Sequence, residues 1–325
     1  MTVDPPAPPP GADAQARARL AWRVAPLSLI FFLDLVDIGR QRDVVDALLF
    51  GAVLVANLEP LNRDPGLAHA YATIETASPD ELRRPVSINA VAQSLRLPFE
   101  TARRRITRMA GTGDLTVTPK GVYVPATILG EPRFMATVLG RHERLRRFYD
   151  DLRALGALPE PPAPDPARPG DAQPIRITNR AVAEYMMRGV DGLLGLTADP
   201  VGALLLMQMT RLNTEGMDDA QLAAWAADPI ARARPVRTGR LAQALRFSAE
   251  TTRRHAIGLE AMGLCARHEA GLIATATPQA RAAIAQLADE NLTSVQRLFA
   301  RLRQLGALDA WDAPPAAARR ARSPA

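Results

Sequence analysis

The chain contains almost no cysteine or lysine and few aromatic side chains. Cys265 is its single cysteine and Lys120 its single lysine. One cysteine excludes an intramolecular disulfide and fits a reducing cytoplasm, so we expect a cytoplasmic protein in which Cys265 is a small core residue and not a redox sensor. Aromatic residues make up only 5% of the sequence. The cores must therefore consist of Leu, Ala, Val and Ile, which favours helices.

Residue patterns typical of enzymes are absent as well. The four histidines, His69, His142, His255 and His268, show no metal-ligand spacing. The sequence has no Gly-x-Ser-x-Gly elbow, no phosphate-binding loop and no Gly-x-Gly-x-x-Gly. We therefore predict no catalytic residues, no metal and no cofactor, and a protein that is not an enzyme.

The two most apolar segments are residues 27–36 and 44–58. Neither reaches the roughly 18 uncharged apolar residues that a membrane-spanning helix needs, and charged residues interrupt both. No secretory signal is evident. We expect two buried helices and no membrane partner. Asp34 on the first of them is either an edge or capped carboxylate, or a contact to a ligand or a buried arginine.

The sequence does contain an internal repeat. Residues 84–104 and 234–254 lie 150 positions apart and match without a gap at 11 of 21 positions. The register continues downstream, where residues 152–158 resemble residues 302–308. Upstream, residues 45–49 resemble residues 201–205 at an offset of 156, so either the copies differ by about six residues in between or this match is only approximate. A repeat of this length indicates two copies of a whole domain.

Each copy is expected to hold two short helices, a tight turn and a β-hairpin. The second helix of the first copy runs from about Phe99 to Ala110, with an inner stripe at helical spacing and a polar outward face. The inner stripes are Ala102, Ile106 and Met109, and Thr252, Ala256 and Leu259. The outward sets are Glu100, Arg103, Arg104 and Thr107, and Glu250, Arg253, Arg254 and Ile257. Gly113 and Gly263 are plausible helix stops. The β-rich runs 115–117 and 122–124, and 264–267 and 272–275, then predict hairpins.

This order resembles that of bacterial winged helix-turn-helix regulators. The likeness rests on Leu-Ala-x-x-Leu, a turn, Glu-Thr-x-Arg-Arg and, in the second copy, Leu-Glu-Ala-Met-Gly-Leu at 259–264. The second-helix residues look most like the cyclic-AMP-receptor type, whereas the element order looks like the multiple-antibiotic-resistance-regulator type. The resemblance covers about 45 residues in each copy, and no cyclic-nucleotide domain pattern is present. It implies a mainly α fold with small β wings, in which two homologous winged-helix domains form a pseudo-dimer.

Composition and the resemblance together give the expected domain boundaries. We place a disordered Pro-rich N-terminus at 1–19, a first winged-helix domain at 20–156, a Pro-rich linker at 157–174, a second winged-helix domain at 175–308 and a disordered basic tail at 309–325. The helix after each wing carries an apolar stripe, Leu145, Phe148, Leu152 and Leu155 in the first copy and Leu292, Val295, Phe299, Leu302 and Leu305 in the second. Such a stripe either closes its own domain or forms a dimer-type seam between the copies.

A net charge of +6 suits a polyanionic partner such as nucleic acid. The resemblance implies that Glu100, Arg104, Glu250 and Arg254 read bases and that Thr101 and Thr251 contact phosphate. Arg103 and Arg253 share the same outward face. Flanking candidates for phosphate contacts are Arg105, Arg108, Lys120, His255, Arg267 and His268. The competing interpretation is plain helix chemistry, because acids favour the first helical turn and arginines favour a solvated face.

We therefore expect a bacterial transcriptional regulator that binds double-stranded DNA at two similar half-sites. It would act as a monomeric pseudo-dimer or as a homodimer, with an effector that the sequence does not identify. The alternatives are a plasmid-type replication initiator and a winged-helix module that binds proteins and not DNA.

Overall fold

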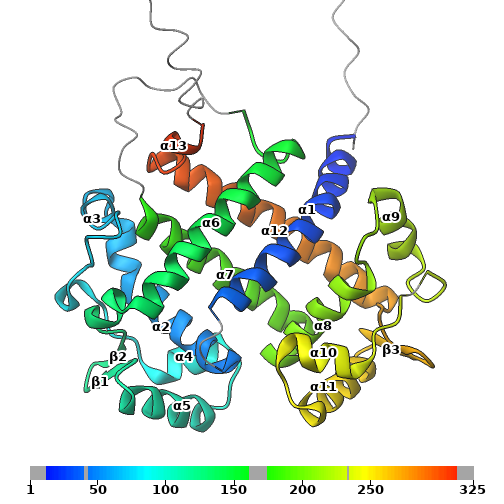
Figure 1. The fold of residues 1–325 in the computed structure, drawn as a ribbon, viewed down its shortest axis with the longest axis horizontal. Helices are drawn as coiled ribbons and strands as arrows, with labels where there is room; N and C mark the ends of the chain where they lie inside the picture. Colours follow the sequence, from blue (N-terminus) through cyan, green and yellow to red (C-terminus); the bar gives the residue numbers. More distant parts are fainter. Residues whose placement is uncertain (1–11, 40–42, 161–173, 233, 313–325) are drawn as a thin grey trace, which may run out of the picture. The chain divides into compact units, whose positions relative to one another are not determined.

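The computed structural model describes residues 12–39, 43–160, 174–232 and 234–312. This part is mostly helical and contains two antiparallel sheets of two strands each (Figure 1), which confirms a mainly α fold with small β elements. The expected disorder of residues 1–11 and 313–325 and the extended linker at 161–173 lie outside the described residues.

The elements repeat in the order that the sequence predicts. In the first half they are α1 (Ala12–Ile38), α2 (Val44–Arg63), α3 (Pro65–Ala70), η1 (Asp80–Leu82), α4 (Ile88–Ser94), α5 (Phe99–Gly111), β1 (Thr116–Thr118), β2 (Gly121–Tyr123), η2 (Ala126–Gly130) and α6 (Pro132–Ala154). In the second half they are α7 (Ile175–Thr197), α8 (Pro200–Asn213), α9 (Asp219–Ala227), α10 (Thr238–Leu245), α11 (Ala249–Ala261), β3 (Cys265–His268), β4 (Gly271–Ala274), α12 (Pro278–Gln304) and α13 (Asp309–Asp312). Sequence patterns did not predict α9.

Helical structure extends into both terminal segments for which we expect disorder. Helix α1 begins at Ala12, so residues 12–19 are helical. Their alanines and arginines favour a helix, and Arg17 donates hydrogen bonds to Asp289 at 3.0 Å and to Thr293 at 2.7 Å. At the other end, residues 309–312 form α13, and the Tyr149 hydroxyl donates to Asp312 at 2.7 Å. Anchoring contacts therefore order residues that composition alone assigns to tails.

Contacts divide the chain into two compact units that do not follow the repeat. Unit I combines residues 1–34 with 189–295, and unit II combines residues 35–188 with 296–325. Helices α1, α7 and α12 therefore contribute residues to both units. Each unit contains one helix-turn-helix and hairpin segment. We call residues 84–124 the N-terminal motif, which lies in unit II, and residues 234–274 the C-terminal motif, which lies in unit I.

In unit II, helix α6 packs against the C-terminal part of α12. Leu145, Phe148 and Leu152 are fully buried. The ring of Phe299 lies 6.1 Å from that of Phe148 and 5.2 Å from that of Tyr149. The apolar stripe of α6 therefore contacts α12, the long helix that follows the C-terminal hairpin.

Two residues of unit I that the sequence singled out, Asp34 and Cys265, have defined surroundings in the structure. Asp34 forms an ion pair with Arg211 at 3.3 Å, and both side chains are partly exposed. Cys265 is buried against Met209, and burial raises the pKa of its thiol to about 11. The thiol therefore stays protonated at neutral pH, as expected of a core cysteine and not of a redox sensor.

Helix α2 is long and apolar enough to cross a membrane, and α7 together with α8 passes the same test; core helices of soluble proteins pass it too. Half of the most apolar window of α2 is buried inside the protein. Its buried residues include Leu48, Leu49 and Val53. The contacts of α2 with α4, α5 and β2 give its apolar face a partner within unit II.

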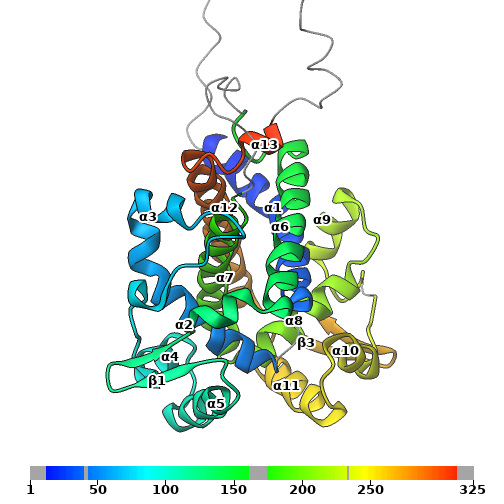
Figure 2. The same cartoon turned by 60° about the vertical axis from the view of Figure 1, so that its left-hand side comes forward.

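A buried asparagine joins each motif to the long helix before it. Asn57, in the C-terminal half of α2, donates to the carbonyl oxygens of Arg84 and Val122 at 2.8 and 3.2 Å, and accepts from the Val124 amide at 2.9 Å. Figure 2 shows the hairpin beside α4 and α5. The Asn57 side chain therefore connects α2 both to the chain entering the motif and to its last strand.

Asn213 makes the same three bonds in unit I. It donates to Arg234 and Leu272 at 2.7 and 3.2 Å, and accepts from Ala274 at 2.7 Å. Both asparagines are completely buried. They lie 156 positions apart, so the structure supports the upstream register, and the connection from the asparagine to the motif is about six residues longer in the first copy.

We predict that Asn57→Ala lowers the free energy of unfolding by about 2–4 kcal/mol, because it leaves two buried carbonyl groups and one amide without partners. Asn213→Ala should have an effect of similar size in unit I. Asn89→Ala on the exposed side of α4 is the matched control and should change stability by less than about 0.5 kcal/mol. Urea unfolding measures the stability of all three variants. If Asn57→Ala and Asn213→Ala were as stable as Asn89→Ala, the structural role of the buried amides would be contradicted.

Candidate nucleic-acid interface

The predicted faces of α5 and α11 are confirmed in both motifs. The buried residues of α5 are Ala102, Ile106 and Met109, and those of α11 are Thr252, Ala256 and Leu259. The outward sets at 100, 103, 104 and 107 and at 250, 253, 254 and 257 are exposed. A helix of two or three turns with one buried stripe leaves its other side available to a partner.

The backbone around these helices also repeats. Arg96 and Arg246 adopt the left-handed conformation, with φ of 50° and 52°, in the turn before the second helix. Gly113 and Gly263 end that helix with φ of 80° and 69°, as predicted for helix stops. In each hairpin turn the glycine faces the strand-like residue that enters the motif, since a Cβ at Gly121 would lie 2.5 Å from the Val86 carbonyl oxygen. These positions fix how each hairpin approaches its helices.

Each exposed helix face carries an ion pair three residues apart. Arg103 donates to Glu100 with Nε–Oε2 at 2.9 Å. Arg253 donates to Glu250 through two nitrogens, at 2.9 and 2.8 Å. The hydrogen bond from the arginine lowers the pKa of each glutamate. The glutamates therefore form their hydrogen bonds with Arg103 and Arg253 and not with Arg104 and Arg254.

Arg104 and Arg254, the arginines that follow these ion-paired residues, are free to contact a bound molecule. Arg104 is exposed and has no hydrogen bond or ion pair among the described residues. Arg254 is exposed as well, and its one polar contact in the described structure is to the His255 ring at 3.4 Å. A guanidinium held on a rigid helix without a carboxylate partner can donate to an acceptor on a bound molecule.

Arg105, the residue after Arg104, forms ion pairs with the N-terminal end of α2. Arg105 donates to Asp43 at 2.7 Å and to Asp46 at 2.8 Å, and Arg108 also pairs with Asp46. Asp43 caps the start of α2 by accepting from the Val45 amide at 3.0 Å. The charge of Arg105 is thus compensated within unit II, which makes this side chain an anchor of α5 and a poor phosphate contact.

His255 takes the equivalent place in the C-terminal motif. Its Nδ1 lies 3.2 Å from an oxygen of Asp199, which caps α8 by accepting from the Val201 and Gly202 amides at 2.9 and 2.8 Å. The side chain of His255 is mostly buried. Asp43 and Asp199 are again 156 positions apart, so a cap carboxylate holds the second motif helix in both units.

The remaining candidates lie at the edges of the motifs. Lys120 is exposed in the β1–β2 turn. Arg267 of β3 pairs with Glu260 at 2.8 Å, and the His268 ring accepts from the Ala270 amide. Thr101 and Thr251 are half-buried at the starts of their helices, where the Thr251 amide donates to the capping hydroxyl of Ser248 at 3.0 Å. Of the charged side chains in this group, Arg267 has a carboxylate partner, whereas Lys120 has no ion pair among the described residues.

Positive charge is concentrated in the motifs. Residues 84–124 contain seven Lys or Arg and two Asp or Glu, and residues 234–274 contain seven and three, so together they carry +9 of a chain whose net charge is +6. The rest of the chain is therefore slightly acidic. Such a separation favours binding of a polyanion at the motifs.

Sequence reasoning missed the residues that hold this surface in place. Asp43, Asp46 and Asn57, and Asp199 and Asn213 in the second copy, lie in segments that repeat weakly. The offset of 156 could have found the Asp and Asn pairs, because it aligns Asp43 with Asp199 and Asn57 with Asn213 around two apolar segments. Nothing in composition marks these residues as partners of the motifs.

No group of His, Cys, Asp and Glu in the described ranges could hold a metal ion. The chain matches no protein-family model, no curated protein and no solved structure at a significant level.

Two adjacent arginines should respond differently to the same substitution. Arg105→Met removes a half-buried ion pair and should lower the free energy of unfolding by about 1–2 kcal/mol. Arg104→Met removes an exposed, unpaired side chain and should change it by less than about 0.5 kcal/mol. Urea unfolding at neutral pH compares the two variants. Equal losses would contradict the assignment of one residue as anchor and the other as available donor.

Proposed function

We propose that the chain is a sequence-specific regulator of transcription that binds double-stranded DNA with two winged-helix domains. The observation that carries this proposal is the repeated face: both motifs keep a Glu–Arg ion pair and, beside it, an exposed arginine without a carboxylate partner. A solvated helix face with no partner would need no such repetition while its neighbours, Phe99 and Ala249 for example, diverge.

The geometry suits reading from the major groove. An α-helix fits this groove, and a guanidinium can donate to both O6 and N7 of a guanine. Arg104 and Arg254 are our base readers. Glu100 and Glu250 keep acceptor capacity beyond their arginine bonds and can accept from a cytosine amino group. Thr101, Thr251, Lys120 and Arg267 contact phosphates, which orient the protein without reading sequence.

In this proposal a single chain supplies the two DNA-binding motifs that two subunits supply in a dimer. Tyr149 and Phe299 occupy equivalent positions 150 residues apart, and their rings lie 5.2 Å apart in unit II. Contact between equivalent positions is what a two-fold relation between the copies produces. We propose a pseudo-dimer that reads two similar but unequal half-sites. In this proposal the chain acts by binding DNA in the cytoplasm of a bacterium.

Affinity for a selected duplex tests the proposal. Arg104→Ala and Arg254→Ala should each weaken binding by about 1–3 kcal/mol and relax one base position in one half-site. Their effects should add, because the residues belong to different motifs. Fluorescence anisotropy on sites selected from random DNA measures these changes.

Arg147→Ala is the matched control, since Arg147 is an exposed arginine of α6 outside both motifs. It should leave the affinity nearly unchanged. Failure of the wild-type chain to bind any duplex in a salt-dependent way would contradict the proposal and favour a protein-binding module. Binding confined to iterated repeats of a replication origin would favour an initiator.

A further inference from the structure

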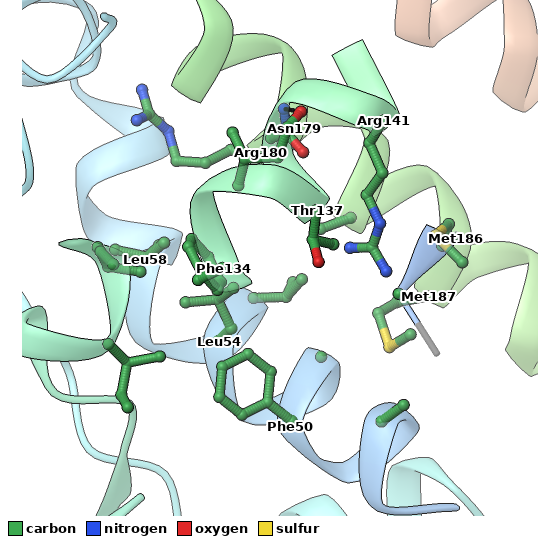
Figure 3. A pocket seen from close by; sticks show the side chains of 18 of the residues that line it. Phe50, Leu54, Leu58, Phe134, Thr137, Arg141, Asn179, Arg180, Met186 and Met187 are labelled. Atoms are coloured by element: carbon green, nitrogen blue, oxygen red, sulfur yellow. Dashed lines mark hydrogen bonds between the residues drawn. The ribbon is translucent and has the colours of Figure 1, made fainter. Parts of the chain in front are cut away.

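Unit II contains a cavity of about 140 Å³. Its walls come from the end of α1 and from α2, η2, α6 and α7. The α2 side is apolar and includes Phe50, Leu54 and Leu58, and Phe134 of α6 faces the same space (Figure 3). By the space that one water requires, the cavity has room for a ligand of about ten non-hydrogen atoms.

The charged side chains that line this cavity are all positive. Among the described residues, four arginines line the cavity and no Asp or Glu does. Three of the four have partners elsewhere. Arg180 donates to the carbonyl oxygens of Tyr71 and Ala68 at 2.6 and 2.9 Å, Arg176 donates to that of Ile74 at 2.8 Å, and Arg133 pairs with Asp114 at 3.1 Å.

Arg141 is the exception. No hydrogen bond or ion pair of its guanidinium occurs within the described ranges, and its Nε is buried without a partner. In Figure 3 its side chain extends from α6 towards Thr137 and Met187. Gly39 leaves room for it, since a Cβ there would lie 2.5 Å from Nη2. Burial lowers the pKa of Arg141 to about 10, so the group is still cationic at neutral pH.

A buried cation without a counter-charge is costly, and an anion that enters the cavity removes this cost. The fork of a guanidinium matches the two oxygens of a carboxylate, and the apolar α2 wall matches a hydrocarbon body. We propose that the cavity binds a small apolar monocarboxylic acid, with its carboxylate on Arg141 and its hydrocarbon body against α2 and Phe134. The site does not depend on the proposed DNA-binding function.

The position of the site gives it a direct link to the N-terminal motif. Helix α2 forms the apolar wall, and the same helix holds α5 through Asp46 and the hairpin through Asn57. A ligand in the cavity therefore contacts the helix on which this motif is anchored.

Calorimetric titration of the full-length chain tests the site, with octanoate as the probe and octanamide as its uncharged isostere. Octanoate should bind saturably and about tenfold or more tighter than octanamide, because only octanoate forms the charged pair. Arg141→Met should reduce octanoate affinity by a similar factor and leave octanamide binding unchanged. Arg147→Met, an exposed position on the same helix, should match the wild type.

A second variant keeps the guanidinium and fills the space. Gly51 lines the cavity in the middle of α2, and a Cβ there meets only the Met187 methyl group at 3.6 Å. Gly51→Leu should therefore fold and should abolish binding of both probes. Absence of saturable octanoate binding to the wild-type chain, or equal affinity for the two probes, would overturn the proposal. No DNA is used, so that result would leave the proposed function standing.

Discussion

A completely buried asparagine is the interaction on which each half of this structure depends. Asn57 and Asn213 place an amide between a long apolar helix and the ends of a motif, and each makes three hydrogen bonds to backbone groups. Buried backbone groups need partners, and no apolar side chain could satisfy both a carbonyl and an amide. The motif is therefore attached at one defined position along its helix.

A second attachment at the helix start completes the arrangement. Asp43 and Asp199 each cap a helix and also hold the basic residue at 105 or 255. Because this residue lies next to the buried stripe of α5 or α11, the helix cannot turn about its own axis without breaking the bond. The exposed arginine one position earlier is then presented in a fixed direction. Rigid presentation of this kind is what base recognition requires.

Local sequence patterns predicted the helices and hairpins of the motifs, but not the contacts that attach the motifs to the neighbouring helices. The stripes at 102, 106 and 109 and at 252, 256 and 259 follow from helical spacing, and the hairpins follow from β-rich runs around glycine. The pairing of Arg105 with Asp43 and Asp46 depends on residues about 60 positions apart, which periodicity cannot connect. The start of α1 at Ala12 likewise depends on a distant carboxylate, Asp289. Arg141 gave no signal, because an arginine among many arginines shows nothing about its surroundings.

Methylation protection at guanine N7 tests the central claim most directly, since this atom faces the major groove and is the expected acceptor for Arg104 and Arg254. On a selected duplex the account predicts two separate clusters of protected guanines. Arg104→Ala should remove protection from one cluster and Arg254→Ala from the other. A single cluster that neither substitution alters, or no protection at all, would contradict the account.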